Sequence, residues 1–524
     1  MIKNEMKKEK IMNVKSSLTK TIMWLSIITI VSKLLGFIRE LVFANYYGVS
    51  YVVDAYVMAF SIPGILFAGI LGCIGTVFIP TYCKVEQNQG LQEANKLTNN
   101  IVNFTMTIAV LVCIGGIVFS GPLLKIFAHG FDQKSFCLAN SFLKLLFVTV
   151  IFSALTTILD SYLQTKNIFI PQALTSIIQN IFIILFVILS IRVNVYFLPF
   201  GIIAAYFLNA GLLSFIARRR GYFYRPCLNF DQNIKYVLVS ALPVFVGSGV
   251  SQINMFVDKT LASGLVEGSV AALNYAMLLN VLVTSLTISL LVTVVYPRFS
   301  KFSSSGNMEE FNKLLNLGIS SIGIVLIPTV LIILVYSREI VSLVYQRGVF
   351  DAKAVSMTSY ALLFYSIGLI FYSLNDLLAR VYYSLYDTKT PLICSSACVI
   401  INVTGSLILS RYLNHGGIAL ASSIAGIFNT CMLYVIIRVK FRKVKIHIDK
   451  VKTAKICLAS IIAITVSYLA YKLILYINVD GHNSAIFLAG ITMGGLMYLF
   501  FLYTLKINEF TMVLNILKNK LRKA

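Results

Sequence analysis

Long apolar stretches recur along the chain between short polar segments, and this pattern restricts the fold more than any single motif. A helix of ~20 apolar residues crosses the ~30 Å hydrocarbon core of a bilayer, and 58% of the 524 residues are hydrophobic while only 12% are charged. Because lipid cannot satisfy open backbone groups, the spans must be helical or form a closed barrel. We therefore predict an all-α polytopic membrane protein with about 14 transmembrane helices. The expected spans are 18–46, 52–83, 98–120, 139–162, 168–190, 195–217, 234–256, 270–297, 314–336, 358–386, 391–411, 417–438, 454–475 and 484–505.

The basic residues predict the orientation. With the N-terminus inside, most of the 44 Lys and Arg residues fall in cytoplasmic segments, as the positive-inside rule expects. The strongest clusters are ARRRGYFYRP (217–226) and RVKFRKVKIHIDKVKTAK (438–455). Such clusters contact anionic lipid headgroups, so the net charge of +24 is interpreted as topological and no nucleic-acid partner is expected. Both termini are predicted to be cytoplasmic, with an amphipathic surface helix in the tail.

Two pairs of segments are similar at an offset of about 220 residues. FAHGFDQKSF (127–136) resembles VYQRGVFDAKAV (344–355), and SYLQTKNIFIP (161–171) resembles VYYSLYDTKTP (381–391). The repeat predicts two six-helix pseudo-repeats, an N-lobe and a C-lobe, around a central cavity, as in transporters whose halves rock about a central site. Two extra C-terminal helices follow. The expected parts are a basic N-terminus (1–17), the N-lobe (18–217), a linker (218–233), the C-lobe (234–438), a basic linker (439–453), the last two helices (454–505) and a basic tail (506–524).

Charged residues occur inside the first predicted span, in the segment SKLLGFIRE (32–40). An ionisable group in the membrane costs several kcal/mol, so it normally faces a cavity or a partner. On a helix, Lys33 and Glu40 fall within about 20° of each other while Arg39 lies about 120° away. The three residues could therefore line one wide hydrated cavity, but not a narrow stripe. In the alternative interpretation, Arg39 and Glu40 extend to the membrane interface or pair with Asp54.

Further candidates come from helix-breaking residues and from other charges in or near the spans. Proline removes a backbone donor and glycine resists bending little, although small residues also serve static helix packing. An i,i+4 ion pair lowers the cost of both charges. The candidates are Gly36, Pro63, Gly64 and Pro80 for helix flexibility, Asp258 and Lys259 for gating or charge pairing, and Asp376 with Arg380 for a structural pair.

The sequence contains no pattern typical of an enzyme. No nucleophile, base and orienting group occur together, and the 9 cysteines include no CxxC pair. We therefore predict no catalytic residue, no metal site and no cofactor. Cationic residues in a cavity instead indicate an anionic substrate, because Arg and Lys bind phosphate oxygens through charge-assisted hydrogen bonds.

The opening helices resemble a known family. SKLLGFIRE followed by DAYVMAFSIP (54–63) is similar to the first two helices of the MurJ (MviN) lipid II flippases, in the multidrug/oligosaccharidyl-lipid/polysaccharide exporter superfamily. Further matches, GVFD (348–351) and YSLYDTKTP (383–391), extend the resemblance over nearly the whole chain. The resemblance implies alternating access and a groove beside the last two helices for a polyprenyl tail. It also implies that the protein moves lipid II from the inner to the outer leaflet of a bacterial plasma membrane during cell wall biogenesis.

The resemblance also implies roles for individual residues. Lys33 and Arg39 would bind the diphosphate, with Lys33 standing where the family usually has arginine. Glu40 and Asp54 would pair with these cations, or with the opposite lobe, when the outer gate closes. Two family positions depart from the pattern: ILFAGILG (65–72) and AMLL (276–279) lack the arginines expected there. Because lysine offers a point charge instead of a bidentate fork, the expected diphosphate site is altered.

These departures leave alternatives open. The chain could move another polyprenyl-diphosphate-linked glycan, for capsule or exopolysaccharide, or act as a non-transporting scaffold for wall-synthesis enzymes. A cation exporter of the same superfamily is disfavoured by the predicted helix count and by Arg39. The expected partners are the lipid-linked substrate, membrane lipids and wall-synthesis enzymes. The sequence does not choose between an ion gradient and the membrane potential as the energy source.

Overall fold

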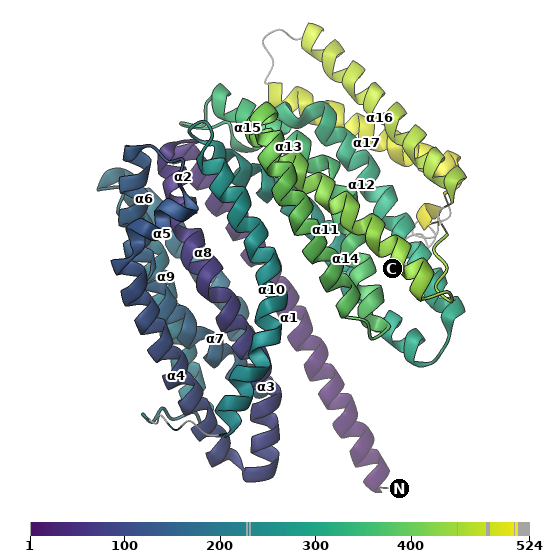
Figure 1. Cartoon of the computed structure of the whole chain (residues 1–524). Helices are drawn as coiled ribbons and strands as arrows, with labels where there is room; N and C mark the ends of the chain where they lie inside the picture. The colour runs from purple at the N-terminus through teal and green to yellow at the C-terminus, as the bar shows by residue number, and fades with distance from the viewer. Residues whose placement is uncertain are drawn as a thin grey trace. The chain divides into compact units, whose positions relative to one another are not determined.

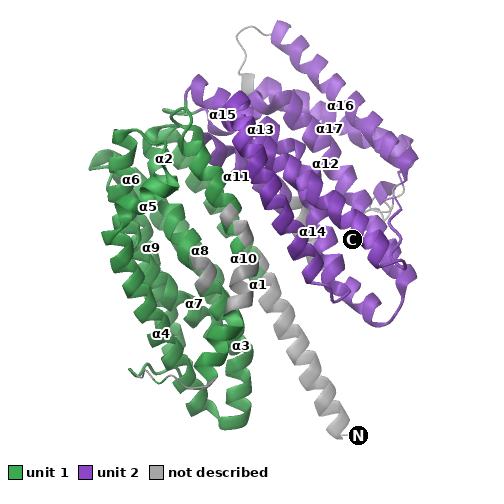
Figure 2. Cartoon of the chain, viewed as in Figure 1, with its two compact units in different colours: residues 1–270, 347–350 green, residues 271–346, 351–524 purple. Residues whose placement is uncertain are grey.

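The structure, a computed structural model, is all-helical, as predicted (Figure 1). It describes residues 2–226, 229, 232–447, 449–477, 483–507 and 509–511, and no strand occurs among them. The chain divides into two compact units (Figure 2), which are described separately. Unit 1 comprises residues 1–270 and 347–350, and unit 2 comprises residues 271–346 and 351–524.

Within its described residues, unit 1 contains ten α-helices and one π-helix. Within it, α1 packs along α8, α2 packs on α6, α10 packs on α3, and α7 lies against both α4 and α9. Buried aromatic rings, among them Phe78, Tyr82 and Tyr162, fill the core between these helices. The helices are α1 (Ile2–Tyr47), α2 (Tyr51–Pro63), η1 (Gly64–Ala68), α3 (Gly69–Gln89), α4 (Leu91–Val118), α5 (Ser120–Phe127), α6 (Gln133–Leu146), α7 (Thr149–Thr165), α8 (Ile170–Arg192), α9 (Phe197–Arg219) and α10 (Gln232–Ser263).

Unit 2 is arranged around α12. This helix packs against α13, α14 and α16, while α15 covers α13 and α14, and α17 packs on α16. The helices are α11 (Ser269–Ser304), of which the first two residues belong to unit 1, α12 (Met308–Tyr345), α13 (Ala352–Ile367), α14 (Leu369–Ser384), α15 (Lys389–Lys440), α16 (Lys450–Ile477) and α17 (Asn483–Thr504).

The described helices agree with a polytopic membrane protein. Eight of them are long and apolar enough to cross a membrane, or up to ten if each of two bent helix pairs counts as one span. The long helix α15 covers two predicted spans and breaks between them at Asn414, where φ is 49° and ψ is −135°. The count of 14 is consistent with these helices and stays a prediction. Most of the predicted tail helix, from residue 512 on, lies outside the described residues.

The lobe boundaries also stay a prediction, because the two compact units follow packing and not the sequence repeat. The unit boundary falls at residue 270, since α10 packs on α3 and belongs to unit 1. The repeat itself has a structural counterpart: α6 and α7 meet at a bend of 41°, α13 and α14 meet at a bend of 44°, and each pair together is long and apolar enough for one bent span. Each bent span begins with an aspartate cap, Asp132 to the Ser135 amide and Asp351 to the Ala354 amide. The spans expected at 139–162 and 358–386 included no such break, and neither break contains proline.

Both sixth helices of the predicted repeat, α9 and the second half of α15, are followed by an extended segment held by asparagines. In unit 1, Asn95, Asn99 and Asn103 of α4 donate to the carbonyls of residues 221, 223 and 225, at 3.2, 3.2 and 3.5 Å. Four helical residues rise about 6 Å, which matches two residues of extended chain. Every second carbonyl therefore meets one asparagine. We call this arrangement the asparagine ladder.

Unit 2 repeats the ladder on α12. Asn312 donates to the Lys443 carbonyl (3.0 Å) and accepts from the Lys445 amide (2.9 Å). Asn316 donates to the Lys445 carbonyl (3.2 Å) and accepts from the His447 amide (2.9 Å). Each asparagine thus satisfies two backbone groups that a loop would otherwise leave to water.

Removing both asparagines of the second ladder, Asn312→Ala with Asn316→Ala, is expected to free the segment around Lys443. Each lost hydrogen bond contributes about 0.5–1.5 kcal/mol, so opening should become at least roughly tenfold easier. Trypsin cleavage at Arg442, Lys443 and Lys445 is then expected to accelerate by at least that factor. Glu309→Ala on the same helix, where the side chain is 80% exposed, is the control. Equal cleavage rates in the double variant and the control would contradict the ladder's role.

Candidate functional site

The Arg39 guanidinium is held between α1 and α8. Its Nη1 donates to Asn180 Oδ1 (3.1 Å), and its Nε (3.1 Å) and Nη2 donate to Glu40 Oε1. The side chain of Arg39 is 27% exposed and that of Glu40 is 13% exposed. Asn180 also donates to the Ser32 carbonyl (3.2 Å), which ties α8 to α1. Because charge-assisted hydrogen bonds are strong where water is scarce, Arg39 is pre-oriented and Glu40 is neutralised.

Lys33 is not part of this cluster. Its side chain is exposed, and within the described residues it has neither an ion pair nor a hydrogen bond. The helical angle places Lys33 near Glu40, but the Glu40 carboxylate bonds to its sequence neighbour Arg39. Gly36 lies beside Asn180, since an added Cβ would meet Asn180 Nδ2 at 3.6 Å, an ordinary contact. The structure therefore brings together Arg39 and Glu40 but not Lys33.

Helix α10 carries a second cationic residue, Lys259. Lys259 donates to the hydroxyl of Ser61 on α2, and both residues belong to unit 1. No carboxylate of the described residues lies within 4 Å of the Lys259 ammonium, and the side chains of Lys259 and Asp258 are both half-buried. Helix α2, which carries Ser61, ends at Pro63, and the π-helix begins directly after it, at Gly64. Such π-turns often mark functional sites in helices. Pro80 lies inside α3.

Asp54 binds the start of α11. Its carboxylate is 4% exposed, and Oδ2 accepts a 2.6 Å hydrogen bond from the Gly268 amide, directly before α11 begins at Ser269. A negative charge is favourable at a helix N-terminus, where backbone amides are unpaired. Gly268 has φ of +88°, and an added Cβ would lie 2.3 Å from Val49 Cγ1. The contact therefore requires both an acid at position 54 and glycine at position 268.

The loops of the repeated motif also pack at helix ends. An added Cβ at Gly130 would lie 2.0 Å from Gly264 Cα, directly after α10. At Gly348 it would lie 2.2 Å from the carbonyl of Asn45, in the last turn of α1, and the Val349 amide donates to that carbonyl (3.0 Å). These backbone approaches, with the Asp54 contact, pack the ends of α1 and α10 tightly within unit 1.

The predicted structural pair in α14 is not formed in this structure. No ion pair of 4 Å or less joins Asp376 to Arg380, and both side chains are exposed. The Arg380 guanidinium instead lies 5.7 Å from the ring centre of Tyr296 and 5.8 Å from that of Tyr383. Cation–π contacts of this kind stabilise an arginine that has no acid partner.

An apolar groove of about 330 Å³ lies between α12, α16 and α17 in unit 2. Gly494 and Gly495 line one side of the groove, where the lack of side chains leaves space, and Pro328 lines another side. Residues of α12 between 324 and 332, of α16 between 460 and 467, and of α17 between 491 and 502 form most of the lining. The lining is mostly apolar, which suits a hydrocarbon chain.

Sequence reasoning missed several polar residues. Asn180 and Ser61 gave no signal, because a single amide or hydroxyl is common in a span. Asp160 could have been found, since it is an acid inside the predicted span 139–162; one of its carboxylate oxygens is buried without a hydrogen-bond partner in the structure. Among the described residues, no cluster of three or more His, Cys, Asp or Glu side chains could hold a metal ion.

Comparisons with known proteins decide the family. A family model described as lipid II flippase MurJ matches residues 43–491. The chain belongs to the MurJ family. A probable lipid II flippase MurJ of Buchnera aphidicola subsp. Baizongia pistaciae is 28% identical over 80% of this chain and 83% of its own length. The family consists of membrane transporters, and the observed helices make this chain a multi-pass membrane protein.

Solved structures agree with this MurJ assignment. The inward closed conformation of a lipid II flippase MurJ matches with a TM-score of 0.79 and 29% identity, covering 91% of this chain and 98% of that chain. An inward-facing multidrug resistance MATE family transporter of the MOP superfamily matches with a TM-score of 0.63 over 79% of this chain and 95% of its own. At 13% identity the second match shows only a shared fold.

Proposed function

We propose that this protein is a lipid II flippase, which moves the undecaprenyl-diphosphate-linked peptidoglycan precursor from the inner to the outer leaflet of a bacterial plasma membrane. The observation that carries the proposal is the Arg39 cluster, a pre-oriented guanidinium within the predicted first span of a MurJ-family chain. A charged group at such a depth is costly unless it serves a ligand or a partner. Transport would follow alternating access, with lobes 18–217 and 234–438 rocking about a central cavity.

In this proposal Arg39 and Lys33 bind the diphosphate. A guanidinium has five N–H donors, and Arg39 uses three of them on Glu40 and Asn180. Two donors, one on Nη1 and one on Nη2, remain for charge-assisted hydrogen bonds to phosphate oxygens. The exposed Lys33 ammonium lies without a partner in the described residues, so it supplies a mobile second charge.

The remaining charged candidates act at the outer gate. Asp54 stabilises the closed gate through the Gly268 amide, and Glu40 keeps the Arg39 guanidinium oriented. Lys259, with Asp258 beside it, provides a further cation whose partner here is the neutral Ser61 hydroxyl. A cation with only a neutral partner is available to an incoming anion. The π-turn after Pro63, with Gly64, would give α2 and α3 the freedom to bend, and Gly36 and Pro80 would do so in α1 and α3.

The apolar groove between α12, α16 and α17 would receive the polyprenyl tail, because the tail must stay in an apolar medium while the headgroup crosses. The termini would face the cytoplasm, where the basic segments contact anionic lipids. The driving force would be the membrane potential, worth ~2.3 kcal/mol per charge per 100 mV, or an ion gradient. Wall-synthesis enzymes that consume the product would be the partners.

Depleting a bacterium of its own lipid II flippase while this chain is expressed tests the proposal. We expect growth to continue and lipid II to become accessible to an enzyme added outside the cells. The uninduced strain is the control for residual flipping. Loss of growth and of outer lipid II, with the protein present in the membrane, would overturn the proposal. Outward movement of another polyprenyl-diphosphate glycan in the same strain would then identify the alternative cargo.

A further inference from the structure

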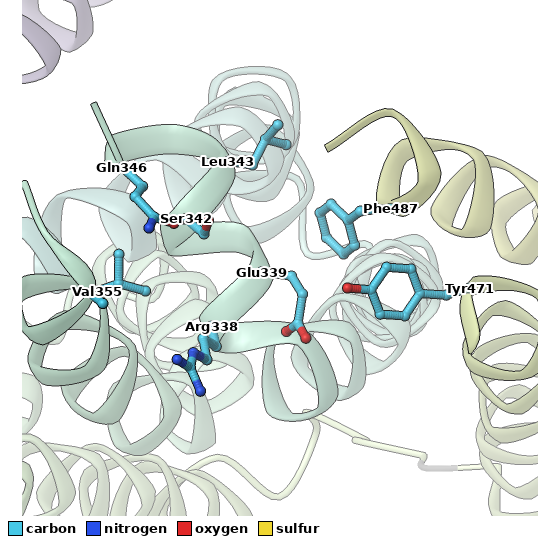
Figure 3. A pocket seen from close by; sticks show the side chains of 9 residues that line it. Arg338, Glu339, Ser342, Leu343, Gln346, Val355, Tyr471 and Phe487 are labelled. Carbon is cyan, nitrogen blue, oxygen red and sulfur yellow. Dashed lines mark hydrogen bonds between the residues drawn. The ribbon is translucent and has the colours of Figure 1, made fainter. Parts of the chain in front are cut away.

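A second pocket, separate from the apolar groove, lies where four helices of unit 2 begin or end. It has a volume of about 200 Å³ and is lined by the last turns of α12, the first turn of α13, the end of α16 and the start of α17 (Figure 3). The pocket and the groove share three helices, α12, α16 and α17. On each of them the pocket residues lie beyond the groove residues, toward the C-terminal ends of α12 and α16 and the N-terminal end of α17. In the predicted topology this is the outer membrane surface.

A break in α12 shapes this pocket. Tyr336 has non-helical angles, φ −120° and ψ 24°, although the helix continues on both sides. Its hydroxyl lies 3.0 Å from Ser467 Oγ, and its ring centre lies 5.9 Å from that of Tyr471 and 5.3 Å from that of Phe487. A backbone outlier held by its surroundings is often part of a binding site. The aromatic cluster separates the groove from the pocket and turns the last residues of α12 into its wall.

The pocket carries both signs of charge in unpaired form. Arg338 and Glu339 both line it, yet neither has an ion pair or a hydrogen bond in the described residues. Although the two residues are sequence neighbours, no ion pair of 4 Å or less joins them, so both charges are open to a ligand. The Tyr471 hydroxyl is turned toward the Glu339 carboxylate (Figure 3). Gln346 accepts from the Ser342 hydroxyl through its side-chain oxygen, which leaves its NH₂ group as a donor.

We propose that this pocket binds the headgroup of a zwitterionic phospholipid with a primary ammonium, such as phosphatidylethanolamine. Arg338 and the Gln346 amide would bind the phosphate, and Glu339 with the Tyr471 hydroxyl would bind the ammonium. A purely anionic headgroup would leave Glu339 uncompensated, and a cation would leave Arg338 uncompensated. The position at the helix ends is the depth at which phospholipid headgroups lie. The site goes beyond the transport function and does not depend on it.

Native mass spectrometry of the purified full chain tests the proposal with three phospholipids of identical acyl chains. The headgroups are ethanolamine, choline and glycerol. We expect ethanolamine lipid to bind about tenfold more than choline lipid, because the trimethylated ammonium cannot donate to Glu339. Glu339→Gln should remove this preference, and Arg338→Gln should weaken binding of all three lipids. Lys353→Gln, an exposed lysine near the pocket but outside its lining, is the matched control and should change nothing.

Three outcomes would overturn the proposal. Equal binding of all three lipids, unchanged in both variants, would show nonspecific annular lipid. Preference for the glycerol headgroup that depends on Arg338 alone would show an anionic-lipid site. Displacement of ethanolamine lipid by lipid II, sensitive to both variants, would assign the pocket to the transported substrate. Thermal unfolding of each variant, expected to match the unmodified chain, distinguishes lost binding from lost folding.

Discussion

Arg39→Gln is expected to abolish transport by this protein, with outer-leaflet lipid II falling roughly 100-fold or more. The guanidinium has two N–H groups left for phosphate oxygens after its bonds to Glu40 and Asn180. Each charge-assisted hydrogen bond contributes about 1.5–3 kcal/mol, and each 1.4 kcal/mol is about tenfold. Glutamine is similar in shape near the backbone but supplies neither the charge nor the fork. The measurement is lipid II exposed outside in the depletion strain.

Two further variants separate a binding role from a structural one. Arg39→Lys keeps the charge without the bidentate fork, so an intermediate rate is expected. Arg39→Gln combined with Glu40→Gln restores the local charge balance while removing the guanidinium from the diphosphate site, where only Lys33 would remain. Normal transport by this double variant would mean that Arg39 only neutralises Glu40. Arg219→Gln, in the last turn of α9, removes a charge outside the cluster and is the control.

Asp54→Ala is expected to open the packed ends of α1 and α10 and to lower transport by roughly 10- to 100-fold. The variant leaves the Gly268 amide without its 2.6 Å acceptor and removes a negative charge from the start of α11. An unsatisfied buried donor costs about 1–3 kcal/mol, which shifts a two-state equilibrium by roughly that factor. Hydrogen exchange at the Gly268 amide measures the change directly and should accelerate.

Asp54→Asn and Glu267→Gln calibrate this effect. Asparagine keeps an acceptor oxygen but loses the charge, so a smaller change is expected than for alanine. Glu267 accepts from the Tyr51 amide (3.1 Å) at an exposed position nearby, and its substitution should have little effect. Unchanged exchange at Gly268 in Asp54→Ala, together with normal transport, would remove Asp54 from the gate.

The helices were predictable because a sufficiently long apolar segment indicates a membrane span by itself. Arg39 was noticeable because it is a charged residue within such a segment. Contacts between distant segments were not predictable. Nothing in the sequence pairs Asp54 with Gly268 or Lys259 with Ser61, since each contact depends on how helices about 200 residues apart pack. The helical angle places Glu40 on the side of Lys33, but the Glu40 carboxylate pairs with Arg39, because a long side chain can reach its sequence neighbour.

The bent spans and the asparagine ladder were missed for different reasons. Neither bend has a proline, and each depends on packing against a distant helix. At the first break the ring of Phe147 occupies the space beside Gly116, where an added Cβ would lie 2.3 Å from the ring. At the second break the Gly368 amide donates to Ser423 Oγ (3.1 Å). The ladder did leave a signal, because Asn95, Asn99 and Asn103 recur every four residues in the sequence.

The ladder also restricts which insertions and deletions this chain can tolerate. Loops between helices usually accept changes in length, but an extended segment alternates the direction of its carbonyls with every residue. Adding one residue between 221 and 225 would turn the following carbonyls away from α4 and break the hydrogen bonds from the remaining asparagines. Length variation among natural homologues is therefore expected outside the segment that the asparagines hold, or within that segment only in steps of two residues.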